Sequence, residues 1–377
     1  MQRLFDPPIS TSNLYSPDVD RLCQTFRRAV DDQGRLVSGA LVKDLELRLC
    51  QYHESQHCIV FATGFWALVA VVKLKCLTDK PQVIIPSFTY RRLADVIFWA
   101  NKTPVMVDVD VETLAIDCNA VRSAISDQTA LILAVHPIVN CCDVTQLISL
   151  ANETQLPIAF DAVESVHETI QGQRIGSFGV GEVFSFHASK LINGIEGGYV
   201  CTNDTVLRDE LVQFRSGQFN ADDQRLWGIN AIMPDGHAAY ALAGLEEIDA
   251  NVAHNQAIYA SYQSALSDVP GIRLLTFNDK EQTSFKNIVA EITDAFPLSR
   301  DELVEHLNQQ GVLARAHYSP ALHTKCYRYP TESSQLPVTE KVMTRLINLP
   351  CGQRVSTGQV RTTCLFLNSL ARSRDDS

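Results

Sequence analysis

Residues 58–72, CIVFATGFWALVAVV, join a short apolar run to a longer apolar segment with almost nothing between them. The run CIVF has the length and composition of a buried strand, and the residues after the turn Ala62-Thr63-Gly64 are long enough for a helix. The stretch therefore predicts a strand that passes directly into a helix, which is the repeating unit of α/β folds.

The same alternation continues toward the C-terminus as far as Cys201. Six further apolar runs follow CIVF: VII at 83–85, VMV at 105–107, LILAV at 131–135, IAF at 158–160, VFSF at 183–186 and GYVC at 198–201. We expect a helix after CIVF, after VII and after LILAV. The seven runs predict a mostly parallel seven-stranded sheet with helices on both faces, a three-layer α/β domain.

The segments on either side of this region complete the expected organisation. Leucines at every fourth position over 41–49 predict an amphipathic helix that packs on the sheet domain. A polar, glycine-rich loop over 216–236 precedes helical periodicity over 238–266, which predicts one connecting helix. We place a large domain at residues 1–245 and a smaller α+β domain at 246–377.

The smaller domain begins its own pattern with KNIVAEI at 286–292, which predicts a strand. Ser299 and Glu302 have the spacing of a capping box, so we expect a helix that opens there and ends near Gly311.

Composition narrows the classes of function. The chain has 377 residues, is 46% hydrophobic and carries a net charge of −11, which argues against a binder of nucleic acid backbone. No apolar run approaches the roughly 20 residues of a membrane span, and the N-terminus lacks a signal-peptide pattern, so we expect a cytoplasmic protein. Eleven cysteines without Cys-x-x-Cys spacing predict reduced thiols rather than disulfides or a metal site, although the vicinal Cys141 and Cys142 leave a redox pair open.

Lys190 is the first candidate for chemistry. It lies in FSFHASKLINGIEGG, residues 184–198, just past the end of an apolar strand. A desolvated lysine loses its proton and can form a Schiff base with an aldehyde, whereas a solvated loop lysine does neither. Asp161 ends the strand in LPIAFDAVE, at the edge where ligands of α/β sheets bind. A carboxylate there can keep the ring nitrogen of pyridoxal phosphate protonated, although Asp161 alone would also suit a helix N-cap.

Two further features fit the same cofactor. The turn at Gly64 presents backbone amides at a helix N-terminus, which is an anion site suited to a phosphate, and the Ser185 hydroxyl can join it. In IIPSFTYRRLADV, residues 84–96, Phe88 and Tyr90 follow a strand end, and Tyr90 is our choice for stacking on a flat ring. Taken alone, each feature would also be explained by an ordinary turn between a strand and a helix or by a position in the core. Together they predict pyridoxal phosphate bound through Lys190.

With these residues in view, the chain resembles the DegT/DnrJ/EryC1/StrS family of sugar aminotransferases, which are pyridoxal-phosphate enzymes of fold type I. The resemblance covers nearly the whole chain. It runs through TGFWAL, VIIPSFTY, PVMVDVDVETL, AVHPIVNCCD, FDAVES, GSFGVGEVFSFHASK, EGGYV, GINAIMPDGHAA and HYSPALH to the NLP of residues 348–350.

The resemblance implies a role for each cofactor residue. Lys190 would be the Schiff-base lysine and proton shuttle, Asp161 the partner of the ring nitrogen, and Ser185 a phosphate ligand. Gly64 and Phe65 fall on the phosphate-binding turn.

Other positions are implied in the same way. Tyr90 falls on the ring-stacking position, and Glu164 falls beside the 3-hydroxyl of pyridoxal. Asn230 would reach the phosphate of a neighbouring subunit, so the resemblance implies a homodimer with shared active sites. The block that would lie near the sugar contains three residues: His317, Tyr318 and His323.

Several residues depart from the family pattern. Phe65 replaces the usual threonine of the phosphate turn, and Ile232 and Val139 replace a basic residue and a glycine. Arg91 and Arg92 stand where small residues are usual in the family. They fall at the expected start of a helix, and the N-terminus of a helix disfavours positive charge. Our hypothesis is that one arginine binds an anionic group of the substrate or of the amino donor, and the alternative is that both are solvated or paired with surface acids.

The resemblance implies an aminotransferase that moves an amino group, from glutamate, to a nucleotide-linked 4-keto-6-deoxy sugar with ping-pong kinetics. Three alternatives stay open. The chain could act on a different keto substrate, serve as a related sugar dehydratase, although those carry histidine in place of Lys190, or be a regulatory descendant without catalysis. The sugar, its nucleotide and the carbon aminated are not specified by the sequence.

Overall fold

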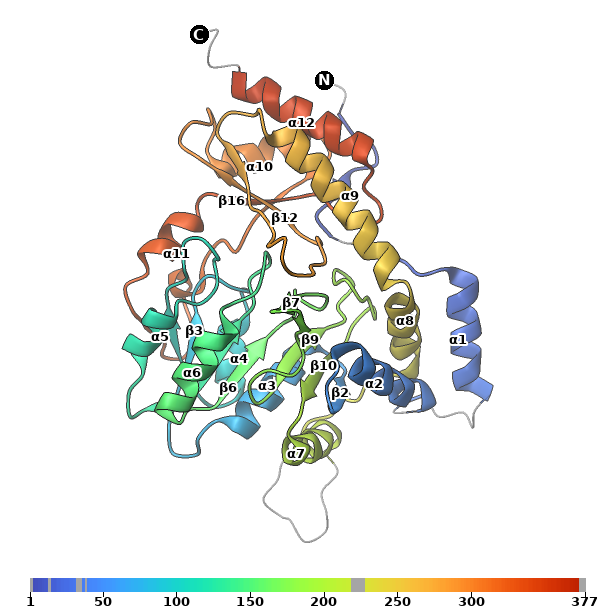
Figure 1. Cartoon of the computed structure of the whole chain (residues 1–377), viewed down its shortest axis with the longest axis vertical. Helices are drawn as coiled ribbons and strands as arrows, with labels where there is room; N and C mark the ends of the chain where they lie inside the picture. The colour runs from blue at the N-terminus through green and yellow to red at the C-terminus, as the bar shows by residue number, and fades with distance from the viewer. Residues whose placement is uncertain (1–2, 13–14, 32–35, 38, 218–227, 373–377) are drawn as a thin grey trace.

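The computed structural model of the chain describes residues 3–12, 15–31, 36–37, 39–217 and 228–372 (Figure 1). A large sheet with its helices forms the lower part of the molecule in that view, and a smaller sheet lies above it with α9 running along one side (Figure 1). No helix within these residues is long and apolar enough to cross a membrane.

The large sheet contains eight strands among the described residues, in the order β15-β4-β3-β5-β6-β9-β10-β2. Their bounds are His57–Phe61 (β2), Gln82–Pro86 (β3), Thr103–Val107 (β4), Thr129–Val135 (β5), Ile158–Asp161 (β6), Glu182–Ser185 (β9), Gly198–Thr202 (β10) and Glu332–Ser333 (β15). Seven of these are the expected strands, and β15 adds a two-residue edge strand from the C-terminal part of the chain. Only β10 runs against its neighbours in this described sheet, so the carboxyl ends of the other strands share one edge.

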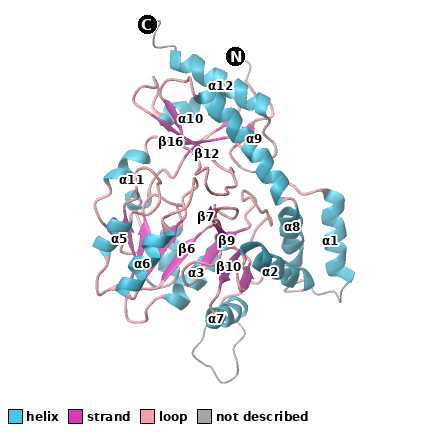
Figure 2. Cartoon of the chain, in the orientation of Figure 1, coloured by secondary structure: helices cyan, strands magenta, loops and turns pink. Residues whose placement is uncertain are grey.

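Alternate residues of each strand enter different cores, which is why the runs are apolar throughout. On one face, Ile59 and Phe61 pack with helices α3 (Gly64–Lys75), α4 (Leu93–Trp99) and α7 (Thr205–Ser216). On the other face, Cys58 and Val60 pack with α2 (Ala40–His53) and α8 (Asp235–Glu246). Helices α5 (Cys118–Ala124) and α6 (Val144–Thr154) cover the rest of that second face (Figure 2).

Helix α5 is one of the helices that the sequence pattern did not indicate. It has seven residues and buries Val121 alone among them, so no apolar repeat marks it. Its start depends on Asp117, whose carboxylate accepts hydrogen bonds from the backbone N–H groups of Asn119 (2.6 Å) and Ala120 (3.0 Å).

The expectation of a single helix over 238–266 was wrong. The chain bends at Glu247, between α8 and α9 (Ile248–Leu266). Leu242 packs under the large sheet, whereas Ile258 and Tyr262 belong to the core of the smaller sheet. The two helices therefore follow two different cores, and the helical periodicity passes through the bend, with Gly244 three residues before it.

The smaller sheet consists, in the described part of the chain, of β11 (Ile272–Leu274), β12 (Ile288–Ile292), β16 (Leu346–Leu349) and β14 (Arg315–Ala316), all antiparallel. It packs with α9, α10 (Arg300–Gln309) and α12 (Thr357–Arg372). The expected capping box of Ser299 and Glu302 opens α10. The N-terminal strand β1 (Ile9–Ser10) pairs with β13 (Val312–Leu313), so Ile9 lies in this second core. The division at residues 245 and 246 stays a prediction.

The remaining described elements are short connections or surface helices: α1 (Val19–Asp31), β7 (Thr169–Ile170), β8 (Gln173–Arg174), η1 (Leu322–Thr324) and α11 (Pro337–Val342).

Asp235 fixes the start of α2 from a position far along the chain. Gly39, the residue before that helix, has no side chain with which to cap it. The buried carboxylate of Asp235 accepts hydrogen bonds from the backbone N–H groups of Gly39 (2.8 Å), Leu41 (3.0 Å) and Val42 (3.3 Å). One side chain thus satisfies three otherwise unpaired donors at the N-terminus of the helix.

We expect Asp235→Ala to lower the free energy of unfolding by about 1.5–3 kcal/mol, because hydrogen bonds to a charged group are lost and buried donors are left unpaired. Urea denaturation measures this loss. The exposed Asp268 provides a control, since Asp268→Ala should change stability by less than about 0.5 kcal/mol. Equal losses in the two variants would contradict the capping role.

Candidate active site

The chemical residues lie at the edge where the carboxyl ends of the parallel strands meet. Asp161 is the last residue of β6, and Ser185 is the last residue of β9. Gly64 opens α3 three residues after β2 ends, and Lys190 lies in the turns that follow β9. Four residues that are separate in the sequence therefore converge because their strands point the same way.

Glycine allows the N-terminus of α3 to lie against β9. A Cβ on Gly64 would lie 3.2 Å from the Cβ and 3.3 Å from the Oγ of Ser185, and a Cβ on Gly198 would lie 2.3 Å from the Cα of Gly64. Thr63 caps the helix by accepting a hydrogen bond from the Trp66 N–H (3.2 Å). The first turn of α3 and the Ser185 hydroxyl form a cradle suited to a phosphate.

Asp161 is buried, and only one of its two carboxylate oxygens has a hydrogen-bond partner. Its side chain accepts a hydrogen bond from the Val163 N–H (3.1 Å), while its other oxygen, Oδ2, is buried without a hydrogen-bond partner. Burial raises the pKa of Asp161 from 3.8 to about 6. A buried acceptor without a donor is costly, and a protonated pyridine nitrogen is a donor that fits it. The residues present therefore fit pyridoxal phosphate at both its ring nitrogen and its phosphate.

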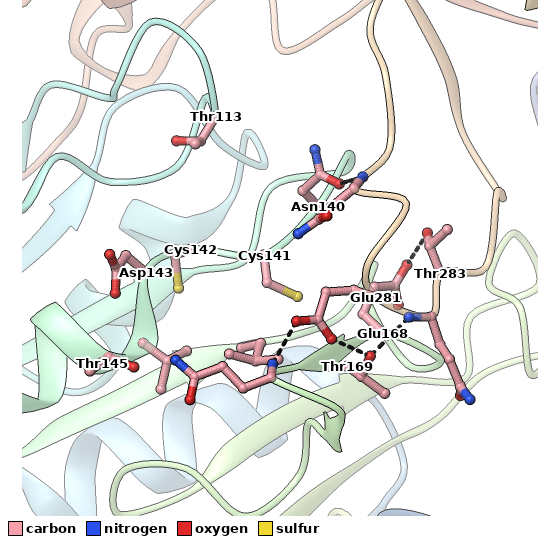
Figure 3. Close-up of a pocket in the computed structure, with 15 residues that line it drawn as sticks. Thr113, Asn140, Cys141, Cys142, Asp143, Thr145, Glu168, Thr169, Glu281 and Thr283 are labelled. Carbon is pink, nitrogen blue, oxygen red and sulfur yellow. Dashed lines mark hydrogen bonds between the residues drawn. The ribbon is translucent and has the colours of Figure 1, made fainter.

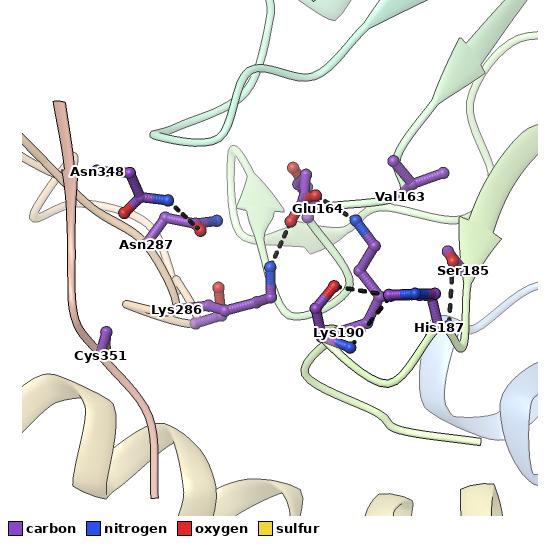
Figure 4. A network of polar contacts seen from close by, with 12 residues as sticks. Val163, Glu164, Ser185, His187, Lys190, Lys286, Asn287, Asn348 and Cys351 are labelled. Atoms are coloured by element: carbon purple, nitrogen blue, oxygen red, sulfur yellow. Dashed lines mark hydrogen bonds and ion pairs between the residues drawn. The ribbon is translucent and has the colours of Figure 1, made fainter. Parts of the chain in front are cut away.

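Glu164 lies between two lysines (Figure 4). One carboxylate oxygen pairs with Nζ of Lys190, and the other pairs with Nζ of Lys286. Burial alone would raise the pKa of Glu164, but the two ammonium groups hold it well below its usual value. The carboxylate therefore remains ionised in a site where an isolated carboxylate would not.

Lys286 was not among the residues expected from the sequence. It lies two residues before β12 and is 5% exposed, and burial lowers its pKa despite the attraction of Glu164. The one signal available was a lysine at the start of an apolar strand. Nothing in the sequence placed that strand beside β6, because the two belong to different sheets.

The C-terminal block reaches the same region. His317 and Tyr318 have ring centroids 3.9 Å apart, and Phe88, which follows β3, meets both rings edge-on. Burial lowers the pKa of His317 to about 3, so its imidazole is neutral near pH 7. His323 lies 2.8 Å from the Ser87 hydroxyl through Nδ1.

The remaining expected residues lie at the surface of the chain. Tyr90 is 43% exposed, and Arg91 and Asn230 are exposed. Arg92 pairs with Asp95 (3.2 Å) and places its guanidinium 5.0 Å from the ring centroid of Phe65. Arg92 therefore pairs with a surface acid of its own chain, which was the alternative to a role in binding an anion. The contact between Arg92 and Phe65 also holds the Phe65 ring at the start of α3.

Residues 19–367 match the DegT/DnrJ/EryC1/StrS aminotransferase family, and the chain belongs to it. It is a pyridoxal-phosphate-dependent aminotransferase with the fold type I architecture that the sequence predicted.

Two solved structures and one curated relative are similar over nearly their whole length. GDP-perosamine synthase of Vibrio cholerae is 25% identical over 359 residues, which cover 93% of this chain and 96% of that protein. The structure of DesI in the presence of its TDP-sugar product is 28% identical, with a TM-score of 0.93 over 99% of this chain and 95% of DesI. DesV of S. venezuelae is 26% identical, with a TM-score of 0.84 over 93% and 94% of the two chains.

The raised pKa of Asp161 predicts a stability that depends on pH in the cofactor-free protein. Because the pKa is higher in the folded state, ionisation opposes folding. This penalty is absent below pH 3.8, grows with pH and is complete above about pH 6. Asp161→Asn should remove it and stabilise the cofactor-free protein at pH 8 by up to about 3 kcal/mol, since each tenfold change in an ionisation constant is worth about 1.4 kcal/mol.

Unfolding at pH 5 and pH 8 measures this effect, with the exposed Asp279→Asn as the matched control. The gain should be smaller at pH 5, and the same variant should bind pyridoxal phosphate more weakly. A gain in the free energy of unfolding that is no larger at pH 8 than at pH 5 would show that burial does not destabilise the ionised Asp161 carboxylate.

Proposed function

We propose that this chain transfers an amino group from glutamate to the keto group of a nucleotide-linked 4-keto-6-deoxy sugar. The observation that carries the proposal is the convergence of Lys190, Asp161 and the α3 cradle at one edge of the sheet. The similarity to GDP-perosamine synthase and to DesI, whose structure contains a TDP-sugar product, supports a sugar nucleotide as the acceptor.

We assign the cofactor contacts to four residues. Ser185 and the first turn of α3 at Gly64 would hold the phosphate, and Asp161 would hold the ring nitrogen in its protonated form. Bound pyridoxal phosphate supplies an aldehyde that can exchange nitrogen with an amino acid and a ring that withdraws electrons from the reacting carbon. Lys190 would bind that aldehyde at rest. Once the donor has displaced it, its free Nζ would take the proton from the donor α-carbon.

Glu164 and Lys286 would keep the charge of the site balanced. When Lys190 is bound to the cofactor, its ion pair with Glu164 would change, and Lys286 would remain as a counter-ion of the carboxylate. The carboxylate can therefore stay ionised beside the cofactor hydroxyl that the family places at this position.

The acceptor would lie against the C-terminal block. His317 is neutral at pH 7, so it and Tyr318 would contact sugar hydroxyls by hydrogen bonds rather than attract phosphate by charge. Of the two arginines, Arg91 is our choice for an anionic group of the substrate or of the donor, because Arg92 already pairs with Asp95.

We also propose a homodimer with shared active sites. Asn230 is exposed on the single chain, as a residue that reaches a neighbouring subunit would be.

A product screen tests the proposal. The protein loaded with pyridoxal phosphate is given glutamate and a panel of nucleotide-linked ketosugars, and products are identified by mass. We expect one sugar to exchange its keto oxygen for an amino group. Lys190→Ala should reduce this rate by about 10²–10⁴-fold or more, because a positioned proton carrier is lost.

Lys280→Ala, which changes an exposed lysine, is the matched control and should keep full activity. Loss of a hydroxyl group without gain of nitrogen would identify a dehydratase instead. Amination only of keto compounds without a nucleotide would exclude the proposed acceptor.

A further inference from the structure

A second cavity contains a pair of cysteines (Figure 3). It has a volume of about 340 Å³ and is lined by residues of the segments 140–145, 168–171 and 278–283 together with Thr113. Cys141 and Cys142 both line it, and its lining includes neither Lys190 nor Asp161. Both cysteines are free thiols.

The thiol of Cys142 faces a histidine whose tautomer is fixed by its neighbours. Nδ1 of His136 lies 3.3 Å from the Sγ of Cys142 and 3.3 Å from the backbone nitrogen of the same residue. A backbone N–H can only donate, so Nδ1 of the neutral imidazole must present its lone pair toward Cys142. That lone pair is the group that can take the thiol proton.

Glu182 supports the other side of the imidazole. Its Oε1 lies 3.3 Å from Nε2 of His136, which carries the ring proton in this tautomer. Its Oε2 accepts hydrogen bonds from the backbone N–H groups of Gly176 and Phe178, which hold the carboxylate in place. The side chains of His136 and Glu182 are both fully buried. A carboxylate, an imidazole and a thiol are thus aligned as in an activated nucleophile.

Cys142 also lies just before a helix. It directly precedes Asp143, the N-cap of the eleven-residue helix α6, and a helix N-terminus stabilises negative charge.

The cavity limits which reagents can reach this thiol. Three acidic residues, Asp143, Glu168 and Glu281, line it and give it a negative field. An anionic reagent is therefore disfavoured, and the volume admits only a small molecule.

We propose that Cys142 is a modification site, activated by His136 and Glu182, that reacts with small uncharged electrophiles entering this cavity. In the step tested here, the Cys142 sulfur attacks the methylene carbon of iodoacetamide. The C–S bond forms as the C–I bond breaks, iodide leaves with the bonding electron pair, and His136 takes the thiol proton and later releases it to water.

Alkylation rates on the cofactor-loaded protein test the proposal. Iodoacetamide and iodoacetate are compared in separate reactions, and peptide mass spectrometry resolves each cysteine. Cys351 is the matched buried control, since it is 1% exposed and its thiol contacts Asn255 and Phe285 rather than a histidine. The exposed Cys326 gives the ratio of the two reagents in the absence of the cavity.

We expect iodoacetamide to label Cys142 at least tenfold faster than Cys351. We also expect its preference over iodoacetate to be larger at Cys142 than at Cys326. His136→Gln should reduce labelling at Cys142 to the rate at Cys351, and Cys142→Ser should abolish the fast reaction without transferring it to Cys141.

A rate at Cys142 no greater than that at Cys351, or a fast reaction at Cys141 instead, would overturn the proposal. So would an unchanged rate in a folded His136→Gln variant. Because His136 is buried and its replacement could unfold the protein, the wild-type comparison of Cys142 with Cys351 and Cys326 decides the question alone.

Discussion

The shared direction of the strands in the large sheet is the constraint on which the site depends. Parallel strands deliver their last residues to one edge, so Asp161 and Ser185 are placed there by β6 and β9. The single reversed strand, β10, brings Gly198 to the same edge and allows α3 to approach closely. The cradle and the buried carboxylate follow from this arrangement of backbone rather than from the side chains alone.

Charge in the site is balanced by buried ion pairs. Burial raises the pKa of Asp161, whereas the partly buried Glu164 is kept ionised by Lys190 and Lys286. Two carboxylates three residues apart thus have pKa values displaced in opposite directions, and the difference comes from the lysines. Opposite pKa shifts in two neighbouring carboxylates are typical of functional sites. Burying a carboxylate costs free energy, and purely structural carboxylates are therefore seldom buried.

Local patterns predicted the parts of the fold whose cause is local. The seven strands, the capping box of Ser299 and Glu302 and the turn at Gly64 each depend on neighbouring residues, and all are present. Lys190 and Asp161 could be nominated because each follows a strand end. Lys286, the cap supplied by Asp235 and the bend at Glu247 depend on contacts between distant segments, and no local spacing encodes them. The family resemblance supplied residue roles but did not identify Lys286 either.

The central claim is that Lys190, and not the second lysine on Glu164, carries the cofactor. Borohydride reduction of the protein loaded with pyridoxal phosphate, followed by peptide mass mapping, tests it most directly, because reduction fixes the cofactor to the lysine that holds it. We predict that the cofactor is found on the peptide containing Lys190, and that Lys190→Ala leaves no modified peptide. Attachment to Lys286, or no attachment in the wild type, would contradict this account of the site.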